Sequence, residues 1–189
     1  MFGHVLLSVI LLLSMTQQQV GLDGQNRSLY ILEDIAHQQW CAYRNERAWN
    51  SDVQSLKAMR VGTIKSVNGR ISIVEVTEQD ETGDWIVYDH YTLSTGLTIS
   101  ALKRTINMLP GDRSEERVFL IQKGRTIKQS SKSHKLSTGR VTRPSDEGLP
   151  EVPIVTNVAA FPFSRLVDER YFRASETEKV CVQTSDKAR

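Results

Sequence analysis

The sequence lacks the short motifs by which common catalytic centres are recognised. It has no Gly-x-Ser-x-Gly, no His-Glu-x-x-His, no glycine-rich phosphate-binding loop and no dinucleotide-binding fingerprint. Histidine is scarce, with four residues in 189, and one of the four is His4 near the N-terminus. A three-histidine metal site would need His37, His90 and His134 to converge. We therefore predict no catalytic residues, no bound metal and no cofactor.

Long apolar runs are absent as well, apart from one near the N-terminus. The nearly unbroken run Val5–Leu13 has the length of a signal-peptide core, whereas a membrane span needs about 20 apolar residues. The residues before it include no Lys or Arg, and Ser14–Thr16 is the only small-x-small cleavage candidate close by. We predict a signal peptide over residues 1–16 and a loose segment over 17–27. An uncleaved anchor and a buried N-terminal helix are the alternatives.

Cysteine occurs only twice, at Cys41 and Cys181, and no Cys-x-x-Cys is present. In an exported protein such a pair indicates a disulfide. The bond would close a loop of about 140 residues and stabilise the fold by on the order of 4–5 kcal/mol. The alternative is a redox or nucleophilic thiol. We predict the disulfide, and with it a secreted, periplasmic or extracellular location.

Charge is nearly balanced overall, at +2, which gives no specific nucleic-acid signal. The charges are nevertheless segregated along the chain. Between Ile71 and Leu102 there are acids and no Lys or Arg, and between Arg117 and Arg143 there are bases and no acid. One interpretation is neutralisation across the sheet. The other is an anion-binding surface.

The candidate anion-binding residues are the bases of the second segment that flank its predicted hairpin: Lys123, Arg125, Lys128, Lys132 and Lys135. The partner itself is unknown. An anionic lipid, an acidic glycan or an acidic surface of a protein would suit these side chains.

The N-terminal part of the domain has helical spacing. Apolar residues between Leu29 and Tyr43 recur mostly every three or four positions, which predicts an amphipathic helix with Ser28 as its N-cap. Trp49, Val53 and Leu56 continue that spacing and predict a second helix, or one helix with a kink.

From Met59 the pattern changes to short strands separated by turns, of which Asn68-Gly69 is the strongest hairpin signal. The predicted strands cover 59–67, 71–77, 85–93, 97–108, 118–122 and 125–129, with a bulge near Ala101 and Leu102. Residues 130–163 hold four of the five prolines and predict an extended arm. A short helix near 164–171 and a final strand at Val180–Val182 follow.

Asp89 and Tyr91 are the candidate pocket residues. They alternate with His90 on one strand, so Asp89 lies on the same face as Tyr91 and on the opposite face from His90. A carboxylate on this aromatic-rich face would be desolvated or paired. The acidic turn 80–84 could attract Ca²⁺, but it lacks the ligand spacing of an EF-hand loop, and an ordinary charged hairpin is the favoured interpretation.

These observations predict an α+β fold. An N-terminal amphipathic helix or helix pair packs on a curved antiparallel β-meander of about six strands, with a Pro-rich C-terminal arm, and residues 28–189 form a single exported domain. For function we predict a non-catalytic binding or structural module that binds an anionic partner through its basic segment. The alternative is a small secreted hydrolase that uses carboxylates on the sheet, with Asp89 among them.

Overall fold

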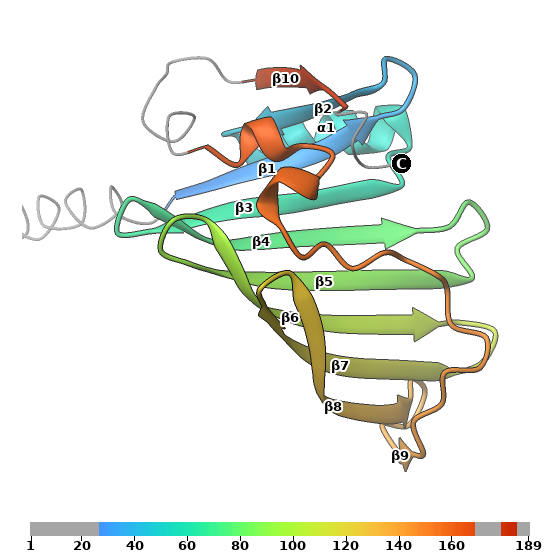
Figure 1. The fold of residues 1–189 in the computed structure, drawn as a ribbon. Coiled ribbons are helices and arrows are strands. Elements are labelled where there is room, and N and C mark those ends of the chain that lie inside the picture. The colour runs from blue at the N-terminus through green and yellow to red at the C-terminus, as the bar shows by residue number, and fades with distance from the viewer. Residues whose placement is uncertain (1–26, 169–178, 185–189) are drawn as a thin grey trace, which may run out of the picture.

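The computed structural model describes residues 27–168 and 179–184, so the predicted signal peptide and most of the loose segment lie outside the described residues. One antiparallel sheet dominates the molecule (Figure 1). Its ten strands follow the order β10-β2-β1-β3-β4-β5-β6-β7-β8-β9. The strands are β1 Arg27–Asp34, β2 Gln39–Tyr43, β3 Arg60–Val67, β4 Arg70–Gln79, β5 Trp85–Ser94, β6 Thr98–Met108, β7 Arg113–Gln122, β8 Arg125–Lys135, β9 Val141–Thr142 and β10 Lys179–Gln183.

The predicted helix between Leu29 and Tyr43 is wrong, and with it the α+β fold of helices on a six-stranded meander. This segment is the β1–β2 hairpin, which turns at Ile35–Gln38 with a positive φ of 52° at Gln38. The hairpin is covered on both faces, so apolar side chains occur at odd and even positions alike. Leu29 and Ile31 belong to one hydrophobic cluster and Leu32 belongs to the other. Two interleaved sets of apolar positions produced spacings of three and four that imitate a helix.

The second predicted helix is present as α1, Glu46–Leu56. Its N-cap is Asn45, whose side chain accepts hydrogen bonds from the backbone N–H groups of Arg47 and Ala48. Trp49 anchors the helix on the sheet by donating its indole N–H to the carbonyl of Ile31 at 3.0 Å. The only α-helix of the described residues thus covers one end of one sheet face.

The predicted strands from 59 to 129 are all in the sheet, and four of them, β4, β5, β7 and β8, are longer than predicted. Asn68 and Gly69 both have positive φ, as do Lys123 and Gly124 at the β7–β8 turn, which suits two-residue hairpin loops. The β5–β6 register shifts between Thr92 and Leu93, close to the predicted bulge. β8 continues to Lys135, so the first six residues predicted for the arm are strand.

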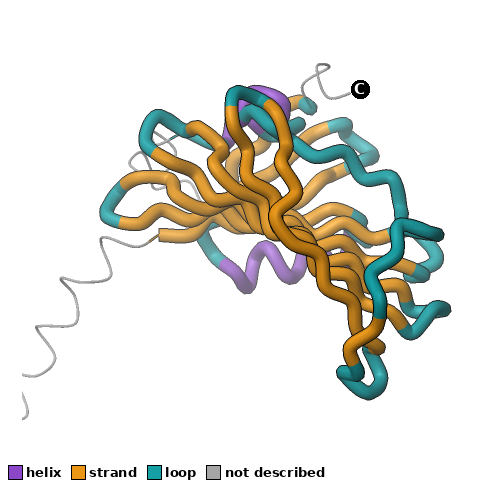
Figure 2. The backbone as a smooth tube through the Cα atoms, turned by 60° about the horizontal axis from the view of Figure 1, so that its bottom comes forward, coloured by secondary structure: helices purple, strands orange, loops and turns teal. Residues whose placement is uncertain are grey.

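The two faces of the sheet are covered differently. We call the face that carries Trp40, Val76 and Tyr91 the inner face, and the opposite face the outer face. Figure 2 shows α1 on one face and a long loop-rich segment crossing the other. This segment, residues 143–167, is called the strap; it contains two short 3₁₀ turns, η1 Val158–Ala160 and η2 Ser164–Leu166. The strap and the inner face share the larger hydrophobic cluster.

Close strand approach on the inner face depends on Gly62 in β3. A Cβ atom at this position would lie 2.1 Å from the backbone oxygen of Glu75 in β4. No other residue type fits there without moving the backbone. Gly62 therefore adds no side chain to the inner face between Ile31 of β1 and Val76 of β4, its two cross-strand partners.

The last strand is joined to the start of the domain, as predicted. β10 pairs antiparallel with β2, and the disulfide links Cys41 to Cys181, which are direct cross-strand partners. The bond spans 140 residues of sequence. It holds the C-terminal strand at one edge of the sheet.

Candidate functional site

The candidate site is a cavity of about 390 Å³ between the inner face and the strap. Its walls include Trp40, Val76 and Tyr91 from the sheet, together with Phe161 and Phe163 from the strap. The aromatic rings contact each other: Tyr91 meets Phe161 edge-on at 5.1 Å, and Trp40 lies 4.7 Å from Phe163. A second cavity, beside the turn at 94–97, has no carboxylate among its lining residues. Of these two cavities, only the first combines an apolar wall with acidic groups; a third, beside Trp85, also includes Asp84 and Glu147 in its lining.

Asp89 lies in this cavity wall, but both of its carboxylate oxygens are engaged. Arg104 of β6 donates to them through Nε at 2.7 Å and Nη2 at 2.6 Å, and the hydroxyl of Tyr91 donates at 3.0 Å. Asp89 and Arg104 are both buried, and burial acts to lower the pKa of Arg104. The hydrogen bonds to Asp89, together with its negative charge, more than offset that effect and raise the pKa of Arg104. The pair is a buried, bidentate salt bridge.

The same arginine holds the strap. Its Nη1 donates to the carbonyl of Val152 at 2.6 Å, and its Nη2 donates to the carbonyl of Pro153 at 3.2 Å. Tyr91 contributes one further contact, because its hydroxyl accepts from the backbone N–H of Val155 at 3.4 Å. Burial raises the pKa of the Tyr91 hydroxyl. Asp89 therefore orients an arginine that fastens the cavity cover.

Beside the Asp89–Arg104 pair, a row of charged side chains crosses β1, β3 and β4 on the inner face. Arg60 in β3 donates to Glu33 in β1 through Nε and Nη2, each at 2.5 Å. Glu78 in β4 is the direct cross-strand partner of Arg60, and it lines the cavity with it. Burial raises the pKa of Glu78, an effect that the positive charge of Arg60 reduces. Glu78 was missed by sequence reasoning, although its alternation with Val74 and Val76 already placed it on the inner face.

Trp40 is the second residue that sequence reasoning missed. Its side chain is fully buried, and within the described part of the chain its indole N–H has no hydrogen-bond partner. An unpaired buried donor costs about 1–3 kcal/mol. The segment had been predicted as helix, and only the correct strand register places Trp40 beside the strap.

The candidate anion-binding bases do not form a single patch. Over Arg125–Lys132, β8 is paired with β7 alone among the described residues. Register and alternation put Lys128 on the inner face, opposite Phe119, and Lys132 on the outer face, opposite Glu116. Arg125 shares the outer face, Lys135 shares the inner face, and Lys123 lies in the turn. Lysines on an open edge also oppose edge-to-edge strand pairing.

Two acids of the acidic segment, Glu75 and Asp89, pair with bases that lie outside the basic segment. Glu75 pairs with Lys65 at 2.6 Å, and Asp89 pairs with Arg104. Arg117 of the basic segment pairs with Asp146 of the strap. The neutralisation thus occurs between adjacent strands and with the strap rather than between the two segments.

The acidic turn and the histidines have ordinary local roles. Asp80 accepts hydrogen bonds from the Thr82 hydroxyl and from the Trp85 backbone, which lowers the pKa of its carboxyl. His90 contacts Glu75 on the outer face, on the other side of the sheet from Asp89. Among residues 27–168 and 179–184 no group of three or more His, Cys, Asp or Glu is placed to hold a metal ion.

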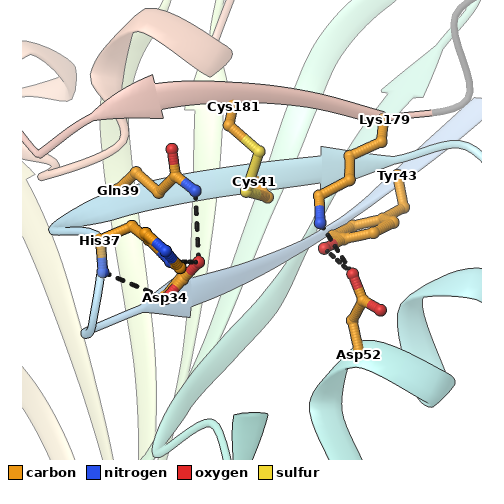
Figure 3. Close-up of a disulfide and its surroundings, with 8 residues drawn as sticks. All are labelled: Asp34, His37, Gln39, Cys41, Tyr43, Asp52, Lys179 and Cys181. Carbon is orange, nitrogen blue, oxygen red and sulfur yellow. Dashed lines mark hydrogen bonds and ion pairs between the residues drawn. A yellow bond between two sulfur atoms is a disulfide. The ribbon is translucent and has the colours of Figure 1, made fainter. Parts of the chain in front are cut away.

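The disulfide lies between two polar clusters, as Figure 3 shows. On one side Asp34 accepts from the side chain of Gln39 and contacts Nδ1 of His37 at 2.7 Å. On the other side Asp52 of α1 accepts from the Tyr43 hydroxyl at 2.7 Å and from Lys179 at 2.8 Å. These contacts fasten the turn, the helix and β10 around the covalent link.

The contacts of Asp52 shift three pKa values, and the hydrogen bond to Asp52 raises that of Lys179. Hydrogen bonds from Lys179 and Tyr43 lower the pKa of Asp52. Burial and the bond to Asp52 raise the pKa of Tyr43 to about 12. Asp52 and Lys179 therefore stay charged over the neutral range, and Tyr43 stays protonated as a hydrogen-bond donor.

Comparisons with protein-family models, with curated proteins and with solved structures find no match to this chain. A disulfide is consistent with an oxidising, exported location. No helix in the described ranges has the length and apolar character that a membrane crossing requires.

Proposed function

We propose that this protein is an exported, non-catalytic binding module, and that its ligands are small molecules with an apolar body. The single observation that carries the proposal is the strap-covered cavity of about 390 Å³. This volume is within the range of small-molecule pockets, about 300–1,000 Å³, and its lining is mainly apolar and aromatic with few polar groups, as such pockets usually are.

The way the cavity is closed supports a binding role. The sheet supplies a fixed wall, whereas the strap crosses it without entering a ladder of strand pairs. Side-chain contacts from Arg104 and Tyr91 hold the strap at the cavity edge. A cover of this kind can move without unpairing a strand of the sheet.

The hydrolase alternative receives less support. It would use Asp89 as an acid or a base, but Asp89 accepts two hydrogen bonds from Arg104 and one from Tyr91. A general base must reach its substrate proton within hydrogen-bonding distance and with a free lone pair. Occupied oxygens fit a positioning role for Asp89.

The experiment is calorimetric titration of the disulfide-intact exported protein with 1-alkanols of increasing chain length. Each buried methylene contributes about 0.8 kcal/mol, so we expect the Kd to fall about fourfold per methylene until the cavity is filled. Val76→Phe narrows the cavity and should weaken or abolish binding. Ile73→Phe is the matched control, because Ile73 pairs with Lys65 and Thr92 on the outer face of the same strand.

No heat with any alkanol, or equal affinities for the wild type and for Val76→Phe, would contradict the proposal. A chain-length dependence that survives in Ile73→Phe and disappears in Val76→Phe would support it. Melting temperatures of both variants, measured in parallel, show whether each one is folded.

A further inference from the structure

The charges around the cavity balance except at one carboxylate. Arg60 is neutralised by its bidentate contact with Glu33, and Arg104 by its bidentate contact with Asp89. Glu78 is the remaining charged residue of the cavity lining. With all five groups ionised, the cavity has one negative charge in excess.

Glu78 lacks a partner of its own. It is opposite Arg60 in the β3–β4 register, but the guanidinium fork of Arg60 is directed to Glu33. Within the described residues no hydrogen bond or ion pair joins Glu78 to another side chain, and its position is only partly exposed. A partly buried carboxylate without a donor is stabilised by a cation that brings its own N–H groups.

The apolar part of the same lining is aromatic. Trp40, Tyr91, Phe161 and Phe163 all contribute to it. The faces of such rings carry partial negative charge and attract ammonium groups within about 6 Å. A carboxylate and aromatic rings in one cavity form the combination that favours organic cations over neutral molecules of the same shape.

We propose that the cavity selects ligands with an alkylammonium group, whose nitrogen is held by Glu78 and whose hydrocarbon part lies among the aromatic side chains. This inference rests on the proposed function, because it names the ligand class of the same cavity. It assigns to Glu78 a binding role that does not depend on Asp89 or on the basic segment.

The test uses three ligands with one hydrocarbon chain: hexylamine, which is a cation at pH 7.5, neutral 1-hexanol, and the anion hexanoate. We expect the wild type to bind hexylammonium about tenfold to a hundredfold more tightly than 1-hexanol, because a charge-assisted hydrogen bond is formed. Hexanoate should bind most weakly. Glu78→Gln should remove the preference for the cation and keep the affinity for 1-hexanol.

Glu75→Gln is the matched control, since Glu75 is on the same strand but points to Lys65 and His90 on the outer face. This variant should keep the full preference for hexylammonium. Affinity for the cation should also fall at acidic pH, because Glu78 is then protonated. The other titratable groups that face the cavity or are paired at its wall are Glu33, Arg60, Asp89, Arg104 and Tyr91.

Two results would overturn the inference: equal affinities of the wild type for hexylammonium and 1-hexanol, or a preference that persists in Glu78→Gln. Both leave the proposed function in place, because 1-hexanol still binds. Absence of binding by all three ligands would instead overturn the proposed function together with the inference.

Discussion

The two halves of the strap are held by different kinds of contact. Residues 143–153, the polar half, are fastened mainly by arginine side chains of β6 and β7. Arg113 donates to the carbonyl of Glu147 at 2.7 Å, and Arg117 contacts Asp146. Residues 154–167, the aromatic half, contribute Phe161, Phe163 and other apolar side chains to the main hydrophobic cluster. Figure 1 shows both halves along one path, from β9 to η2.

The comparison teaches that the aromatic half holds the strap on the sheet more strongly than the polar half does. We call the aromatic half the anchor of the strap. Burial of an aromatic side chain stabilises the fold by several kcal/mol. A hydrogen bond within the protein replaces hydrogen bonds to water, so its net contribution is only about 1 kcal/mol. Three buried polar atoms beneath the polar half, Arg113 Nε, Glu115 Oε2 and Arg117 Nε, have no hydrogen-bond partner within the described residues. Opening of the cavity should therefore begin at the polar half.

The largest effect is expected from the Cys41–Cys181 disulfide, whose second cysteine follows the aromatic half along the chain. Replacing both cysteines, as Cys41→Ser with Cys181→Ser, should lower the free energy of unfolding by roughly 5 kcal/mol, because the unfolded chain regains the freedom of a loop of 140 residues. Denaturant titration of the variant and of the oxidised protein measures this difference. A loss below about 1 kcal/mol would mean that the tether at β10 is not a major anchor.

Truncation of the aromatic half comes next. Phe161→Ala should cost about 3–5 kcal/mol, since the ring is 1% exposed and contacts both Tyr91 and Phe163. Val141→Ala, at a side chain that is 80% exposed, serves as the control and should change stability little. Thermal unfolding of both variants gives the comparison, and similar melting temperatures would refute the description of this half as the anchor.

The Asp89–Arg104 pair lies at the junction of the halves. Asp89→Asn should cost about 3 kcal/mol because it leaves a buried guanidinium without its charged partner. The double variant Asp89→Leu with Arg104→Met should recover much of that stability while it releases the strap carbonyls. Amide hydrogen exchange of residues 150–155 should therefore accelerate in the double variant. Unchanged exchange rates would show that Arg104 does not hold the strap.

A smaller effect is expected within the polar half. Arg117→Gln removes the contacts to Asp146 and to the carbonyl of Ser145, and Asp146 is 80% exposed, so solvent screens most of the charge interaction. We expect a loss of about 1 kcal/mol or less and faster exchange of residues 143–148. A loss as large as that of Phe161→Ala would abolish the distinction between the halves.

The smallest effect concerns the ion pair beside the disulfide. The lowered pKa of Asp52 means that its contribution is present above the ordinary carboxyl value near 3.8 and is lost as pH falls through the lowered value. Asp52→Asn should cost less than about 1 kcal/mol at pH 7, because Lys179 is 45% exposed. The difference from the wild type should shrink as pH falls below 3.8 in acid unfolding curves. A difference independent of pH would point to lost packing instead.

Local patterns predicted the middle of the sheet well. Hairpin signals such as Asn68-Gly69 are specific because few residues tolerate positive φ, and the strands beside them alternate. The β1–β2 hairpin was mispredicted because burial on both faces removes the alternation. Its coverage comes from α1 and from strap residues more than 100 positions away, which no local window contains.

The candidate site was predictable only in part. Strand alternation placed Asp89 and Tyr91 together on the inner face, which is where they lie. Their partners, Arg104 and the strap backbone at 152–155, come from other parts of the chain, and only the tertiary fold joins them. Phe161 and Phe163 flank Pro162 in the predicted arm, and this pair of aromatic residues was the signal that part of the arm is buried.

The pairing of β10 with β2 also has a consequence for how the chain acquires its structure. β2 needs a neighbour that is synthesised some 140 residues later, so one edge of the growing sheet stays open until β10 is available. Contacts between such distant residues slow folding, and an unpaired edge invites pairing with other chains. Catalysed thiol oxidation during folding would shorten that vulnerable interval, so the yield of native protein should depend on the oxidant supplied to refolding.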